Sequence, residues 1–215
     1  MNAGKKFRSG LVSLSVLTAL LLSVLVVSPA AAGSSSLSAE EIAGLQFMRE
    51  EEKLARDVYL TLYQKWGLAI FNNIANSEAT HMAAVKTLLD RYGIADPAAG
   101  TAVGVFADAS LQALYNQLVA QGSQSLAAAL KAGGAIEEVD IRDLQVRIAG
   151  TTHADVKTVY SNLLNGSYNH LRAFARTLKI QTGEVYQPQY LDAATYQSIM
   201  SGSNGRRGRS GGGWR

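Results

Sequence analysis

Apolar side chains recur every three or four positions through most of the chain after residue 37. This spacing is typical of amphipathic helices, and the strict alternation typical of β-strands is nearly absent. The pattern predicts long helices at about residues 39–66, 69–92, 125–149 and 152–179, and short ones at about 110–120 and 191–200. We therefore expect an all-α protein, with a four-helix bundle and a short C-terminal helix within residues 37–200.

Residues at the ends of these segments support the helix boundaries. Ser38 precedes the first segment with Glu41 three positions later, the pairing of a capping box, and Gly67 follows the segment. Residues 93–108 are rich in Gly and Ala and indicate a long connection, so a long crossover should join the second and third long helices. The Gly-Gly pair at 133–134 should weaken the third long helix.

Polar side chains interrupt the apolar stripe of the second long helix. Glu78 and His81 fall on the same face as Phe71, Ile74, Met82, Val85 and Leu89. Their i, i+3 spacing lets the two side chains converge on one point. Because a buried carboxylate is costly unless it is paired or binds a cation, this pair indicates a metal site.

The other long helices also place acid or imidazole groups on their apolar faces. Glu52 shares a face with Leu45, Met48 and Tyr59, whereas Glu51 lies about 100° away and is left open as an inward group. The third and fourth long helices add Glu137, Asp140 and His170, and the local spacing leaves open whether Glu137 or Glu138 faces inward. The expected metal ligands are Glu52, Glu78, His81, Glu137, Asp140 and His170.

Each of these residues also has an ordinary structural interpretation. A single Glu-x-x-His is common on helix surfaces, and a single inward His is usually a hydrogen-bonded core residue. Taken together, however, four carboxylates in one bundle would repel one another strongly, and two divalent cations would neutralise them. Four carboxylates and two imidazoles are the ligand set of a dimetal carboxylate site.

Two motifs resemble the ferritin-like diiron-carboxylate superfamily, and rubrerythrins in particular. EKLARDVY at residues 52–59 is similar to the first-helix pattern of that family, and FNNIANSEATH at 71–81 is similar to its second-helix pattern. The resemblance covers residues 37–179 by helix order and implies that Glu52 is a terminal or bridging ligand. It implies that Glu78 bridges two metals and that His81 binds one of them. The whole-chain pattern most resembles a bacterial and archaeal branch of that superfamily, a group known as domain of unknown function 2202.

The chain departs from the rubrerythrin pattern in two ways. The fourth helix of the family carries a second Glu-x-x-His, but here Ser167 stands three positions before His170, and Asp140 is the candidate replacement carboxylate. Rubrerythrins also carry a cysteine-ligated iron domain, and this chain has no cysteine. Electrons would therefore come from another protein or from the substrate.

These features favour a dimetal oxidoreductase that acts on peroxide, dioxygen or ferrous iron. Carboxylate and imidazole ligands suit two iron ions, with manganese as the alternative. Tyr59 could hydrogen-bond a ligand or relay an electron, or it could be an ordinary core tyrosine. The competing hypotheses are a metal-binding or sequestering module without turnover and a purely structural helical domain. The expected partners are a small oxidant or a metal ion and an external electron donor, and a homodimer is left open.

The two ends of the chain carry its positive charge. Residues 1–32 are typical of a secretory signal peptide, with basic residues, an apolar run and a small-residue cleavage site. Residues 33–36 are expected to form a linker, and the Gly/Arg-rich residues 201–215 a disordered tail. Without the seven cationic residues of the ends, the net charge falls from +3 to about −4. We therefore expect an exported protein whose folded body binds neither nucleic acid nor, after cleavage, a membrane.

Overall fold

The computed structural model describes residues 36–202, and this part of the chain is all-α, as the sequence predicts. Its helices are α1 (Ala39–Trp66), α2 (Ala69–Arg91), α3 (Ala109–Gly122), α4 (Leu126–Gly150), α5 (Ala154–Thr182) and α6 (Ala193–Ser201). The predicted capping box is present at Ser38 and Glu41, and Gly67 ends α1 with a left-handed φ of 63°. Because α6 extends to Ser201, the first residue of the predicted tail is helical.

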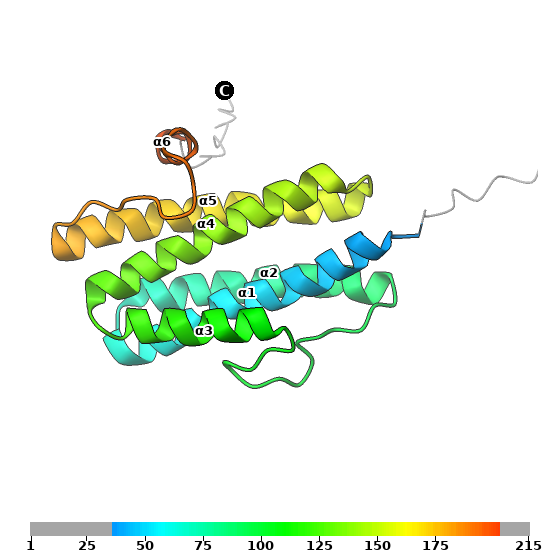
Figure 1. The fold of residues 1–215 in the computed structure, drawn as a ribbon, viewed down its shortest axis with the longest axis horizontal. Coiled ribbons are helices and arrows are strands. Elements are labelled where there is room, and N and C mark those ends of the chain that lie inside the picture. Colours follow the sequence, from blue (N-terminus) through cyan, green and yellow to red (C-terminus); the bar gives the residue numbers. More distant parts are fainter. Residues whose placement is uncertain (1–35, 203–215) are drawn as a thin grey trace, which may run out of the picture. The chain divides into compact units, whose positions relative to one another are not determined.

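Contacts between helix ends define the directions of the four long helices. The indole Nε1 of Trp66, at the end of α1, donates to the carbonyl of Gly122 just before α4. Glu41, at the start of α1, accepts from Thr151 just after α4. These two contacts make α1 and α4 antiparallel. Because the short turn at Gly67 also makes α2 antiparallel to α1, α2 and α4 run in the same direction, and the connection that contains α3 returns along the length of α1 (Figure 1).

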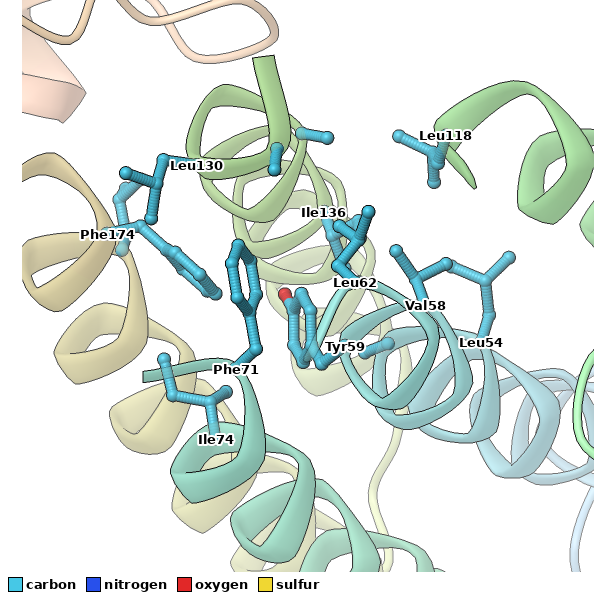
Figure 2. Close-up of a cluster of buried hydrophobic side chains, with 14 of the residues drawn as sticks. Leu54, Val58, Tyr59, Leu62, Phe71, Ile74, Leu118, Leu130, Ile136 and Phe174 are labelled. Atoms are coloured by element: carbon cyan, nitrogen blue, oxygen red, sulfur yellow. The ribbon is translucent and has the colours of Figure 1, made fainter. Parts of the chain in front are cut away.

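A large apolar cluster fills the space between the helices near the end of α1. Tyr59, Phe71 and Phe174 lie together at its centre, where the Tyr59 and Phe174 rings are 5.1 Å apart and the Phe71 and Phe174 rings 5.9 Å apart (Figure 2). Gly133 makes this packing possible, because a Cβ there would lie 2.5 Å from the Phe174 ring. The glycine pair does not interrupt α4, which continues through it, and the missing side chains make room for aromatic rings.

The crossover between α2 and α4 is fastened to α1 by buried polar groups. Lys53 is almost fully buried, and its ammonium lies 2.5 Å from a carboxylate oxygen of Asp57. It also donates to the carbonyls of Ala102 and Val105, at 2.8 and 3.0 Å. Asp57 in turn accepts from the backbone of Gly104. This ion pair therefore holds the connection against one side of α1.

Three sequence-based expectations lie wholly or largely outside the described residues. The signal peptide (1–32) and almost all of the linker and the tail fall before residue 36 or after residue 202. Between those limits, the helices are too short or too polar to cross a membrane.

Two Lys–Asp pairs with the same i, i+4 spacing allow a matched test of the crossover anchor. Lys53→Met should lower the free energy of unfolding by about 3 kcal/mol, because it removes the buried cation of Asp57 and leaves only the more exposed Arg56 to pair with that carboxylate. Lys86→Met removes the exposed Lys86–Asp90 pair and should cost less than about 1 kcal/mol. Urea denaturation of both variants gives the comparison, and equal losses would show that burial adds nothing to the Lys53–Asp57 pair.

Candidate metal centre

Three consecutive glutamates of α1 are all buried, and each faces a different neighbour. Successive helix positions differ by about 100° in direction, so the run distributes its charges around the helix. Glu50 accepts from the backbone N–H groups of Ala107 and Asp108 and holds the crossover. Glu51 faces the charged groups Asp143 and Arg147 of α4. Glu52 faces α2 and is the member that reaches the candidate centre.

The first candidate ligand group consists of Glu52, Glu78 and His81. The ring Nδ1 of His81 lies 3.1 Å from an oxygen of Glu52 and 2.7 Å from an oxygen of Glu78. One ligand atom from each residue lies within 4.8 Å of the other two, a spacing that a single metal ion can span. Helix α1 supplies Glu52, and the Glu-x-x-His pair of α2 supplies the other two.

The second candidate group consists of Glu78, Glu137 and His170, and it meets the same 4.8 Å criterion. The Nδ1 atom of His170 lies 2.8 Å from the second oxygen of Glu78 and 3.4 Å from an oxygen of Glu137. Glu78 therefore belongs to both groups and presents one oxygen to each histidine. The two imidazole rings are stacked, with centroids 5.6 Å apart.

Neighbouring side chains fix the orientation of the second group. The hydroxyl of Tyr59 donates to Glu137 at 2.5 Å, so the core tyrosine also contacts the candidate centre. The outer nitrogen of His170, Nε2, lies 3.0 Å from the hydroxyl of Ser77. If Nε2 carries the proton and donates to Ser77, Nδ1 keeps its lone pair for a metal. Sequence reasoning missed Ser77, because a partly exposed serine beside Glu78 gives no signal of its own.

Asp140 lies beside these two groups but belongs to neither. It is buried, and one of its carboxylate oxygens forms a short hydrogen bond with the Ser167 hydroxyl of α5. Its other oxygen, Oδ1, has no hydrogen-bond partner, and the same is true of Oε1 of Glu52. Unpaired buried carboxylate oxygens are rare because their desolvation is costly. Five of the six predicted ligands thus meet in two groups, and the sixth lies next to them.

The structure distinguishes the adjacent glutamates that the sequence left open. Glu137 faces the histidines, whereas the Glu138 carboxylate accepts from the Tyr186 hydroxyl and from the backbone N–H groups of residues 189, 190 and 191. Glu138 is therefore a buried anchor for the chain between α5 and α6. Its partners lie about 50 residues away in sequence, so no local pattern could reveal this role.

Burial shapes the electrostatics of the centre. Desolvation raises the pKa of Glu52 to about 8, against the opposing effect of His81, and it also raises the pKa of Asp140 well above its ordinary value. Burial opposes ionisation of Glu78 as well, but its contacts with His170 and His81 outweigh this effect and hold its pKa at about 2. Despite burial, the surrounding carboxylates raise the pKa of His81 to about 11 and that of His170 to about 10. The site therefore attracts positive charge strongly, whether protons or metal cations supply it.

Replacing each of the two adjacent glutamates separates their roles. Glu138→Gln should lower the free energy of unfolding by about 1–3 kcal/mol, because the amide cannot accept all of the hydrogen bonds that converge on the carboxylate. It should also speed hydrogen exchange of the amides at 189–191. Glu137→Gln should leave that exchange unchanged. Loss of protection in both variants would contradict the division of roles.

Comparison with known proteins places the chain in a family. An uncharacterized protein MJ0754 of Methanocaldococcus jannaschii is 52% identical over 170 residues, which are 79% of this chain and 91% of that protein. The crystal structure of hypothetical protein MJ0754 from Methanococcus jannaschii matches with a TM-score of 0.76, covering 78% of this chain and 95% of the solved one. The family model described as uncharacterized protein domain DUF2202 matches residues 41–203. The chain therefore belongs to the DUF2202 family.

Proposed function

We propose that residues 36–202 form a ferritin-like four-helix bundle that holds two metal ions in a carboxylate-bridged centre. The observation that carries this proposal is the pair of ligand groups that share Glu78. Glu52, Glu78 and His81 would hold one ion, and Glu78, Glu137 and His170 the other. The parallel course of α2 and α4 agrees with the long crossover of ferritin-like bundles.

The charges of the candidate ligands fit two divalent cations. Glu52, Glu78, Glu137 and Asp140 carry four negative charges when ionised, and neutral histidines add none. Two divalent cations balance that charge and provide partners for the buried oxygens that lack hydrogen bonds. Asp140 stays in the proposal as the fourth carboxylate, because its free Oδ1 lies on the same helix face as Glu137.

Oxygen and imidazole ligands suit iron first and manganese second. Bound iron would supply one-electron redox chemistry toward peroxide, dioxygen or ferrous iron as substrate. The chain itself would surround the ligands of α1 and α2 with apolar side chains. It would also orient Glu137 through the hydrogen bond from Tyr59 and orient His170 through its contact with Ser77. Because the sequence has no cysteine, the electrons would come from a partner protein or from the substrate. Export remains part of the proposal through the signal-like residues 1–32.

Metal content and metal-linked stability test the centre. Protein loaded with Fe²⁺ or Mn²⁺ should contain two metal ions per chain and unfold at a higher temperature than the chelated protein, because the ions bind the folded state. Glu78→Gln should lose most of both the metal and the thermal gain, since this residue serves both groups. His81→Ala should lose about one ion. A Glu78→Gln variant that retains two ions would contradict the shared ligand.

Consumption of peroxide separates the oxidoreductase from a sequestering module. Iron-loaded protein supplied with a chemical reductant should consume peroxide over many turnovers, and His170→Ala should slow this consumption at least about tenfold because it removes a ligand of one ion. The amount of peroxide consumed is compared with the iron present. Consumption that stops at one equivalent per centre would favour storage or sequestration of metal over catalysis.

A further inference from the structure

A line of carboxylates connects the candidate centre with the surface along the seam between α1 and α4. Glu137, Asp140 and Asp143 follow one another at three-residue intervals on α4, so they lie along one face of that helix. Asp143 is partly exposed, whereas the other two are buried. From α1, Glu51 faces this row: it is within hydrogen-bonding reach of Asp143, and after desolvation the charges of Asp140 and Asp143 do most to raise its pKa.

Within residues 36–202 no cation forms an ion pair with Glu51, and its hydrogen-bonding neighbour is another carboxyl group, that of Asp143. Glu51 is only 4% exposed, and its Oε2 atom has no hydrogen-bond partner. Among the described residues no ion pair joins it to Arg147, whose Nε is also without a partner and whose guanidinium lies over the ring of Phe47. In contrast, the neighbouring Glu50 uses both oxygens to hold the crossover. Glu51 is thus a buried acid whose hydrogen-bonding contact is with another acid rather than with a cation.

A small cavity adjoins Glu51. It lies between α1, α3 and α4, and its volume of about 10 Å³ is close to that occupied by one water-sized species. Apolar side chains, among them Leu54, Leu118 and Ile136, form the rest of its lining. Glu51 is the one acidic or basic residue in this lining.

We propose that Asp143, Glu51 and Asp140 form a route along which divalent cations pass between the surface and the metal centre. The inference rests on the proposed function, since it names how the ions of that centre arrive. Carboxylate oxygens bind hard divalent cations, and a row of one sign of charge between apolar walls concentrates ions of the opposite sign. At the inner end, the free oxygen of Asp140 passes the cation to Glu52 and Glu137. These are the two carboxylates whose charges do most to raise the pKa of Asp140.

Rates and equilibria of Co²⁺ binding test the route in the full-length protein. Uptake by the metal-free protein is followed by visible absorption in a stopped-flow instrument, and release is followed after addition of a chelator. Glu51→Gln should slow uptake and release by the same factor, at least about tenfold. The number of ions bound and the dissociation constant should not change, because Glu51 is not a ligand. Asp143→Asn should also slow both uptake and release. Because Asp143 is partly exposed, this variant tests the route even if Glu51→Gln disturbs the packing of the seam.

Asp90→Asn is the matched control, because it removes the same charge from an exposed position on α2. Its rates should equal those of the unaltered protein, and equal slowing in all three variants would overturn the route in favour of a general surface-charge effect. Unchanged rates in both route variants would also overturn it, as would a weaker dissociation constant for Glu51→Gln, which would make that residue a ligand. If the unaltered protein binds no Co²⁺, the proposed centre fails together with its route, whereas binding at unchanged rates removes the route alone.

Discussion

The interaction on which the candidate centre depends is the contact of the Glu78 carboxylate with two imidazoles. Its two oxygens lie 2.7 Å from His81 and 2.8 Å from His170. This one acidic side chain of α2 therefore contacts a histidine of its own helix and a histidine of α5. Around it, Glu52, Glu137 and Asp140 arrive from α1 and α4 and bring more negative charge than two histidines can balance. A buried excess of one sign is expensive, so either protons or the proposed metal cations must balance it.

Helix α1 organises much of the molecule around that centre. Its Glu52 and Tyr59 face the interior, while Glu50, Lys53 and Asp57 fasten the crossover on another side. Holding the crossover fixes the parallel course of α2 and α4, and that course brings Glu78 and Glu137 together. The same helix thus positions ligands directly and also maintains the topology that lets ligands from distant segments meet.

The family relationship defines the chain without assigning a reaction. The DUF2202 model spans nearly the whole described region, and the M. jannaschii relative carries only the name of an uncharacterized protein. The chemical argument therefore rests on side-chain geometry. The proposal of a metal centre draws on the shared position of Glu78, the contact of His170 with Ser77 and the contact of Glu137 with Tyr59.

The sequence by itself determined the elements and the identity of most groups that gather at the centre. Helical periodicity, the capping box at Ser38 and the turn at Gly67 are local properties, and the inward direction of Glu52, Glu78, His81 and His170 follows from the geometry of a single helix. Only the tertiary structure decided between Glu137 and Glu138, because the choice depends on Tyr186 and the backbone at 189–191. Likewise, the burial of Lys53, the separate directions of the three adjacent glutamates and the place of Asp140 beside Ser167 depend on which helices become neighbours. Spacing along one helix fixes the direction of a side chain, but its partner is set by packing between segments that are far apart in the chain.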